Sequence, residues 1–109
     1  MKKIILTPDV EIALRTLDLE GVRRAHAWFA CLQRWDFDEV VRKNSEPLED
    51  LPGVYVLRTT TDIRIFFRIE GDTVTILDIA KRAAILSSVH VSGDGTQDVV
   101  NRLRRQASA

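Results

Sequence analysis

The 109-residue sequence is poor in three things: cysteine, net charge and long apolar segments. Its single cysteine, Cys31, excludes an intramolecular disulfide and a cysteine-based zinc cluster, and it fits a reducing cytosol. The apolar residues of Met1–Leu6 are too few for a signal sequence before Pro8 interrupts them, and no apolar run has the length of a membrane span. We therefore expect a cytoplasmic protein that does not enter a membrane.

Sixteen basic residues balance sixteen acidic ones, so the formal net charge is zero. This balance argues against unspecific binding of nucleic acid over the whole surface, and any contact with RNA or DNA must come from a local patch. The charges are unevenly distributed, because acids gather in residues 36–50 and bases in residues 58–82 and 102–105. The length fits one domain over residues 1–109, with a core in residues 3–88 and a C-terminal extension in residues 89–109.

The most regular stretch of the chain predicts three neighbouring strands, Val54–Arg58, Asp62–Ile69 and Val74–Ala80. Apolar and polar side chains alternate along the middle strand, which is typical of a sheet with one buried face. Gly71 and Asp72 predict a two-residue hairpin of the II′ type, with the glycine at positive φ.

This turn fixes a register for the hairpin. It places Ile69 opposite Val74, Phe67 opposite Ile76, and Arg64 opposite Ile79. One face of the sheet would then combine two cations with three large apolar side chains. The members of this face are Arg64, Arg68, Phe66, Leu77 and Ile79. Part of it is expected to lie under the chain's own last helix, Val99–Gln106, and the rest to receive a partner.

The flanking segments predict a strand at Lys3–Leu6 and a helix that begins at Pro8 with Thr7 as its cap. A second helix is predicted from about Gly21 to Trp35, followed by a short helical turn near residues 38–42. Together these elements predict an α+β fold. An N-terminal strand and a helical hairpin would pack on a mostly antiparallel four-stranded sheet, with a helix at the C-terminus.

Three motifs in this order resemble the RelE/ParE superfamily of bacterial type II toxins. They are Glu46-Pro47-Leu48 with Leu51-Pro52-Gly53-Val54-Tyr55-Val56-Leu57-Arg58, then Asp62–Phe67, then Ile76–Arg82. The resemblance implies a microbial-ribonuclease-like sheet, no metal or cofactor, and a cognate antitoxin as partner. One branch of the family cleaves mRNA on the ribosome through attack of a ribose 2′-hydroxyl on the adjacent phosphate. The ParE-like branch inhibits DNA gyrase without nuclease activity. The sequence does not decide between a monomer and a homodimer.

The resemblance also implies roles for single residues. Arg64, Arg82 and Glu46 would be catalytic, the arginines at the scissile phosphate and Glu46 as the base. Arg58, Lys81 and Arg68 would bind substrate. Five of these residues have a plainer interpretation as well: Arg64 in a surface salt bridge, Arg58 as a tie to the acidic segment, Lys81 and Arg82 at a solvated strand end, and Glu46 as a solvated loop residue.

The sequence departs from the nuclease pattern at two places. Val54 and Val56 stand where many nuclease members carry lysines, and Ser87 and Ser88 stand where they carry a tyrosine. His90 lies nearby and has a pKa range suited to acid–base work. These departures favour the gyrase inhibitor, whereas Glu46 and the pair Arg64 and Arg82 favour the nuclease, which is the leading hypothesis. The near-zero net charge agrees with a third interpretation, a relative that has lost toxicity and acts as a binding module.

Overall fold

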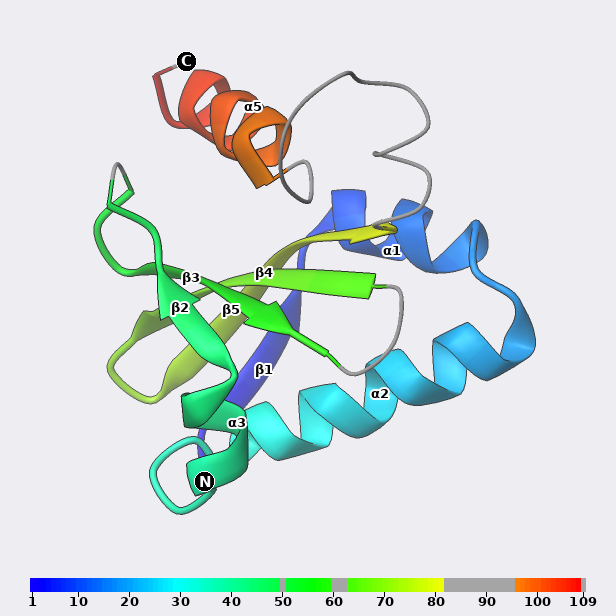
Figure 1. Cartoon of the computed structure of the whole chain (residues 1–109), viewed down its shortest axis with the longest axis vertical. Coiled ribbons are helices and arrows are strands. Elements are labelled where there is room, and N and C mark those ends of the chain that lie inside the picture. The colour runs from blue at the N-terminus through cyan, green and yellow to red at the C-terminus, as the bar shows by residue number, and fades with distance from the viewer. Residues whose placement is uncertain (50, 60–62, 82–95, 109) are drawn as a thin grey trace.

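The computed structural model describes residues 1–49, 51–59, 63–81 and 96–108 (Figure 1). Within these ranges the strands form one five-stranded sheet in the order β1-β5-β4-β3-β2. The elements in chain order are β1 (Lys3–Leu6), α1 (Pro8–Arg15), α2 (Leu19–Gln33), α3 (Glu39–Lys43), β2 (Ser45–Pro47), β3 (Val54–Arg58), β4 (Ile63–Glu70), β5 (Thr73–Lys81) and α5 (Thr96–Ser108). None of the described helices is long and apolar enough to cross a membrane.

The α+β class and most element positions agree with the prediction, but the sheet differs in two respects. It has a fifth strand, β2, and it is mixed, because β1 runs parallel to β5 while the other neighbours are antiparallel. β2 is three residues long and ends at Pro47, which cannot donate a ladder hydrogen bond and is tolerated at a sheet edge. Such a short strand leaves almost no alternation in the sequence, so the predicted four-stranded sheet was wrong.

Local chemistry explains where the first two helices begin. Pro8 opens α1 as predicted, after an extended Thr7. The Thr7 hydroxyl does not cap the helix; it donates instead to the Leu77 carbonyl at 3.3 Å. In α2 the Asp18 carboxylate accepts a 2.7 Å hydrogen bond from the Gly21 amide. This N-cap places the start of α2 at Leu19, two residues before the predicted start.

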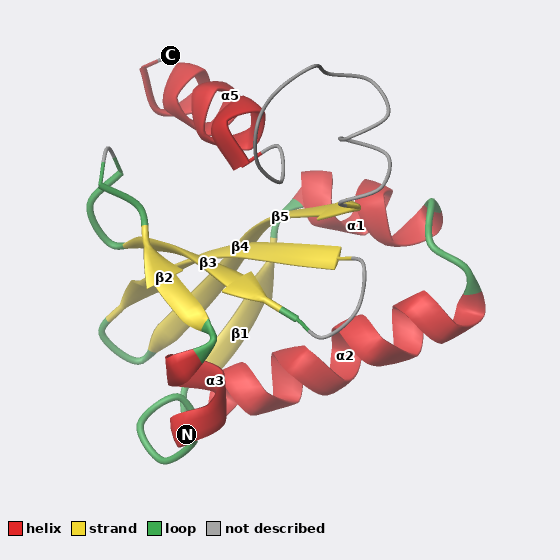
Figure 2. Cartoon of the chain, viewed as in Figure 1, coloured by secondary structure: helices red, strands yellow, loops and turns green. Residues whose placement is uncertain are grey.

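One face of the sheet is covered by α1 and α2, as Figure 2 shows, and holds the larger core. Three aromatic rings form its centre beside β3 and β4. The Trp35 ring centroid lies 5.4 Å from Tyr55 and 5.7 Å from Phe67, and the last two rings stack at 5.5 Å. The fully buried members of this core are Val10, Ala25, Leu32, Val41, Leu57, Ile65, Phe67, Val74 and Ile76. Residues that alternate along β3, β4 and β5 thus fix the position of both helices.

α5 covers the opposite face of the sheet (Figure 2). Its apolar residues Val99, Val100 and Leu103 are buried against the sheet and the β2–β3 connection. The residues beneath them are Leu51, Val54, Val56 and Phe66, with Leu48, Leu77 and Ala80 at the margin. The helix therefore fills much of the face that the sequence predicted as partly open.

A β-bulge changes the predicted register of the central hairpin. Gly71 has φ +56°, and Ile69 pairs with Val74 and Phe67 with Ile76, as predicted. The register then shifts by one residue between Phe66 and Phe67, so Arg64 lies opposite Ala80 instead of Ile79. An extra residue in one strand reverses the faces that follow it. Ile79 is consequently in the core under α1 and α2, and its prediction as a member of the opposite face was wrong.

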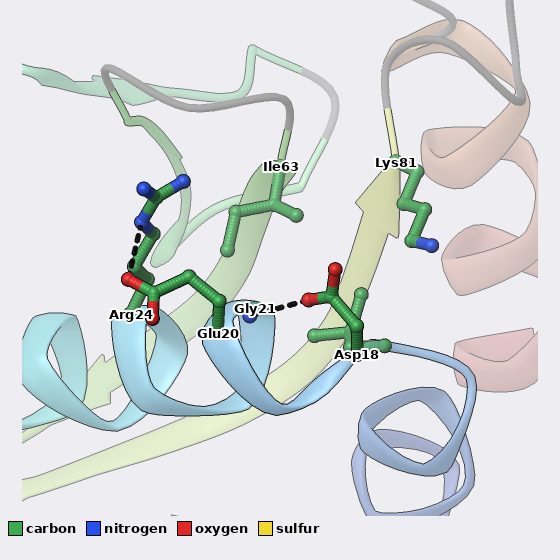
Figure 3. Close-up of a pocket in the computed structure, with 7 residues that line it drawn as sticks. Asp18, Glu20, Gly21, Arg24, Ile63 and Lys81 are labelled. Atoms are coloured by element: carbon green, nitrogen blue, oxygen red, sulfur yellow. Dashed lines mark hydrogen bonds and ion pairs between the residues drawn. The ribbon is translucent and has the colours of Figure 1, made fainter.

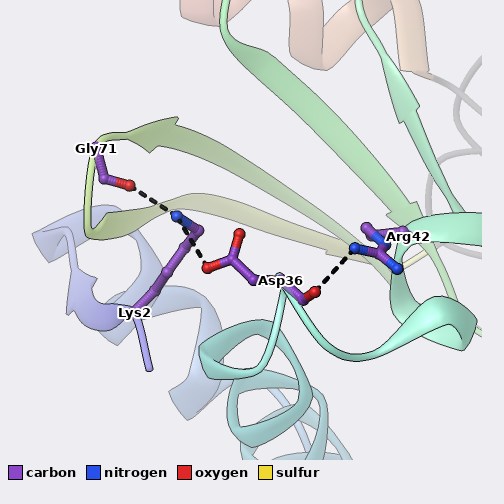
Figure 4. A network of polar contacts seen from close by, with 4 residues as sticks. All are labelled: Lys2, Asp36, Arg42 and Gly71. Carbon is purple, nitrogen blue, oxygen red and sulfur yellow. Dashed lines mark hydrogen bonds and ion pairs between the residues drawn. The ribbon is translucent and has the colours of Figure 1, made fainter.

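The N-terminus is held by a separate polar network (Figure 4). Lys2 Nζ donates to the Gly71 carbonyl at 2.7 Å and lies 3.6 Å from Asp36 Oδ2. Arg42 Nη1 donates to the Asp36 carbonyl at 3.1 Å. These contacts tie the start of β1 to the hairpin turn and to the segment between α2 and α3.

Candidate functional site

Two arginines face each other across β3 and β4. Arg58 and Arg64 are direct Cα partners in the antiparallel ladder, so both side chains lie on the face that α5 covers. Directly opposed residues have Cβ atoms about 4.5–5.5 Å apart. Arg58 is exposed, whereas Arg64 is buried, with 8% of its surface exposed. The sheet thus holds one accessible and one enclosed guanidinium side by side.

Glu46 joins this pair from the edge strand. Its Cα partner is Val56, which places Glu46 on the same face as Arg58. Glu46 Oε2 lies 3.1 Å from Arg58 Nη2 and accepts from Arg58 Nε at 3.2 Å. Both side chains are largely exposed, and such a pair adds little to stability. The structure therefore brings together three of the predicted site residues, Glu46, Arg58 and Arg64.

The buried Arg64 donates from Nη1 to the carbonyl of Ile63 at 3.2 Å. A guanidinium cannot lose its proton in a protein, so the charge stays on this face when the side chain is enclosed. A buried cation must be matched by acceptors or anions, because its desolvation is costly. Arg64 is thus the enclosed cation of the site and Arg58 the exposed one.

Arg68 lies on the same face but farther along the strand. It is the partner of Val54 and Thr75, about 13 Å from Arg64 at the usual rise of a strand. Arg68 Nη1 lies 3.5 Å from Glu70 Oε1. Its buried Nε has no hydrogen-bond partner within the described ranges. Arg68 is thus an outlying cation, separate from the Arg58–Arg64 pair.

Lys81 does not join the cluster. It is the partner of Ile63, and its side chain points to the α1–α2 side, with Nζ 3.5 Å from the Thr16 carbonyl. Figure 3 shows it beside Asp18 in a cleft of about 210 Å³, lined by Leu17, Asp18, Glu20, Gly21, Arg24, Ile63 and Lys81. The predicted grouping of Lys81 with Arg64 was therefore wrong. Arg82, Ser87, Ser88 and His90 lie outside the described residues.

The sequence reasoning missed an ion pair between β5 and α5. The Asp78 carboxylate is 6% exposed, accepts a 2.8 Å hydrogen bond from the Ile79 amide, and pairs with the Arg102 guanidinium. Asp78 is the partner of Phe66, so the bulge turns it toward α5. The sequence did contain a signal for this pair. Asp78 is a lone carboxylate in an apolar strand, and a buried carboxylate requires a cation.

On this face the guanidinium groups of Arg58 and Arg64 can bind an anion, and the carboxylate of Glu46 can accept a proton. Paired arginines on rigid strands are suited to a phosphate, which they bind through charge-assisted hydrogen bonds. No group of three metal-ligating side chains occurs in the part of the chain that the structure describes.

Two solved structures have the same fold over most of the chain. One chain of the toxin–antitoxin complex RelBE2 from Mycobacterium tuberculosis matches this protein with 25% sequence identity and a TM-score of 0.55. The match covers 74% of this chain and 98% of that chain. The RelB–RelE antitoxin–toxin complex from Methanococcus jannaschii matches 77% of this chain and 96% of its own, with 14% identity and a TM-score of 0.60. No family model and no curated protein sequence matches the chain. The two structural matches confirm the resemblance to the RelE/ParE superfamily that the motifs indicate.

Proposed function

We propose that this chain is the toxin of a type II toxin–antitoxin module, and that its Glu46–Arg58–Arg64 cluster binds and cleaves mRNA on the ribosome. The fold likeness to RelB–RelE complexes supports a place in such a module. The observation that carries the chemical part is the cross-strand pair of Arg58 and Arg64, with Glu46 on Arg58. Three charged groups converge from three strands on one face.

The reaction would be an internal transfer at the RNA backbone. The ribose 2′-oxygen attacks the adjacent phosphorus while its proton passes to the Glu46 carboxylate. The bond from phosphorus to the 5′-oxygen breaks, which leaves a 2′,3′-cyclic phosphate and a 5′-oxyanion that takes up a proton from water to become a 5′-hydroxyl. Arg58 and Arg64 stabilise the negative charge that develops on the phosphate oxygens. The resemblance in Ile76–Arg82 implies that Arg82 supplies a further cation. The requirement for a 2′-hydroxyl restricts this chemistry to RNA.

A second candidate is a non-enzymatic inhibitor of the ParE type, with DNA gyrase as its target. The favouring observation is at Val54 and Val56, which are each 1% exposed beneath α5. These positions offer no proton donor or acceptor, whereas many nuclease members of the family carry lysines there. In this case Arg58 and Arg64 would bind a protein or a nucleic-acid backbone without chemistry.

The proposed partner that controls the chain is an acidic, partly disordered antitoxin segment that folds on docking. Its carboxylates would engage Arg58 and Arg64, and so compete with a phosphate for the same cations. Neutralising these two cations is a sufficient mechanism of inhibition.

Induced expression in bacteria tests the toxin assignment. We expect growth arrest from the wild-type chain and relief by Arg64→Met, which removes the charge but keeps the apolar stem of a buried side chain. The control for loss of one positive charge is Arg24→Gln, because Arg24 lies on α2, in an exposed ion pair with Glu20 at 3.3 Å, and is not part of the proposed cluster. Wild-type protein that accumulates without slowing growth contradicts the assignment.

A further inference from the structure

The backbone carbonyl of Ile63, at the start of β4, receives two hydrogen bonds. The Thr59 hydroxyl donates to it at 2.8 Å, and Arg64 Nη1 donates to it at 3.2 Å. A carbonyl oxygen has two lone pairs, so it can accept from both donors at once. Thr59 and Arg64 are each 8% exposed, so little water competes for either bond. One acceptor thus connects a buried hydroxyl to the enclosed cation of the proposed site.

The peptide unit of Ile63 is held from several sides. The Ile63 side chain is 5% exposed and belongs to the larger core. Its Cα partner in β5 is Lys81. The Thr59 hydroxyl reaches it from the residue that directly follows Arg58, the last residue of β3. Thr59 therefore links the carbonyl that binds Arg64 to the end of the strand that carries the second arginine.

The bond to this carbonyl restricts the long, flexible side chain of Arg64. An arginine loses rotamer entropy when its guanidinium is fixed in one position. Here Nη1 is bound to the carbonyl of the preceding residue, so the guanidinium stays near the start of β4. Arg58 is the Cα partner of Arg64 and ends β3, so both cations lie at the same end of these two strands. A group that is already in place on binding costs less entropy to a ligand that needs both cations.

From these contacts we propose that Thr59 is a positioning residue, which holds the Ile63 carbonyl and through it the Arg64 guanidinium in place for a phosphate beside Arg58. Thr59 touches no substrate in this proposal. The inference rests on the proposed function for its consequence, which is tighter binding of RNA. The positioning itself is measurable without RNA and without activity.

Two other interpretations of the Thr59 hydroxyl make different predictions. In the first, the hydroxyl only stabilises the link between the two strands, so its loss lowers stability and leaves Arg64 unchanged. In the second, the two donors compete for one acceptor, so loss of the hydroxyl strengthens the bond from Arg64 and holds the guanidinium more firmly. Positioning alone predicts that loss of the hydroxyl loosens the guanidinium.

The test compares the full-length wild type with Thr59→Val, Thr59→Ser and the matched control Thr7→Val. Thr59→Val keeps a similar shape and removes the hydroxyl, whereas Thr59→Ser keeps the hydroxyl. Thr7 also donates its hydroxyl to a carbonyl of the sheet, that of Leu77 at 3.3 Å, and Leu77 is not a ladder partner of Arg64. The control thus removes the same kind of bond at another place. Circular dichroism verifies that each variant stays folded.

Two readouts are measured on each protein. The first is the NMR order parameter of the Arg64 Nε–H group, assigned with Arg64→Met, and it reports the mobility of the guanidinium alone. The second is the affinity for a 2′-O-methyl RNA oligonucleotide, which lacks the 2′-hydroxyl nucleophile. In the wild type we expect an order parameter near about 0.85 for Arg64 and below about 0.6 for the exposed Arg24.

Thr59→Val should lower the order parameter of Arg64 and weaken RNA binding by about three- to tenfold, the equivalent of one hydrogen bond. Thr59→Ser should restore both values, because it keeps the donor to the Ile63 carbonyl. Thr7→Val should leave both values as they are in the wild type.

Arg64 that is as mobile as Arg24 in the wild type overturns the proposal, and this measurement needs no variant to fold. An order parameter of Arg64 that stays the same or rises in Thr59→Val overturns it too. So does a serine variant that behaves like the valine variant, or an equal loosening of Arg64 in Thr7→Val. Loosening in Thr59→Val and recovery in Thr59→Ser, without RNA binding by any of the proteins, supports the positioning and counts against the proposed function.

Discussion

Arg58 of β3 and Arg64 of β4 are cross-strand partners, two cations side by side on one face of the sheet. Like charges in this position destabilise a sheet by roughly 0.2–1 kcal/mol. Glu46 offsets part of this repulsion through its contact with Arg58 at 3.1 Å. A phosphate bound to both arginines would act in the same direction.

Substitution of Arg58 should separate stability from binding. Arg58→Gln removes both the repulsion from Arg64 and the exposed ion pair with Glu46, so stability should change by less than about 1 kcal/mol. Affinity for RNA should fall by about 1.5–3 kcal/mol, the contribution of a charge-assisted hydrogen bond. Urea denaturation and fluorescence anisotropy give the two values. Arg24→Gln is the control, and an equal loss of affinity in both variants argues against a site at Arg58.

Arg64 needs a different substitution, because its side chain is buried on a face that the sequence predicted as partly open. The residue is buried, so Arg64→Ala leaves a cavity and should destabilise by about 1–3 kcal/mol. Arg64→Met fills most of that space and should be closer to wild type in stability while it loses binding equally. Thermal unfolding of the two variants checks this. If Arg64→Ala is as stable as wild type, the side chain is not packed as described.

The aromatic centre of the larger core should dominate stability. Phe67 is fully buried between β3, α1 and α2 and contacts the rings of Trp35 and Tyr55. Phe67→Ala should cost about 3–5 kcal/mol. Phe37, which is 74% exposed, is the control, and Phe37→Ala should stay within about 0.5 kcal/mol of wild type. Similar effects at both positions, measured by denaturant unfolding, contradict the assignment of the core.

The N-cap of α2 gives a smaller and more local prediction. Asp18→Ala removes the acceptor for the Gly21 amide and should cost about 1 kcal/mol. Asp18→Asn keeps an acceptor and should cost a few tenths of that amount. Unfolding midpoints of the two variants test this, and an Asn variant as unstable as the Ala variant shows that charge, not the cap, is what matters.

The central hairpin shows how far the sequence determines this fold. Alternation in residues 63–69 and a glycine at the turn were enough to predict β4, β5 and the pairs next to Gly71. The bulge lies at Leu77 of β5, opposite Phe66 and Phe67, and leaves no mark in the alternation, because either register places apolar residues on both faces. The error it caused moved Ile79 to the wrong face and concealed Asp78 as a partner of α5.

Part of the candidate site was also predictable from the sequence. Motif resemblance singled out Glu46, Arg58 and Arg64, which the structure brings onto one face. It also singled out Lys81, which lies opposite Ile63 at the end of β5 and so faces α1 and α2. Spacing along the chain cannot tell these cases apart, since the side on which a strand residue lies depends on every bulge before it.

The most direct test of the central claim is cleavage of mRNA on translating ribosomes. Purified chain is added to a translation reaction, and RNA ends are mapped and analysed for chemistry. We predict fragments that end in 2′,3′-cyclic phosphate, formed equally after the protein is treated with EDTA. Glu46→Gln should lower the yield by about 10²–10⁴, the range for loss of a general base. Intact mRNA, together with blocked DNA supercoiling by gyrase, would contradict the enzyme and favour the ParE-like inhibitor.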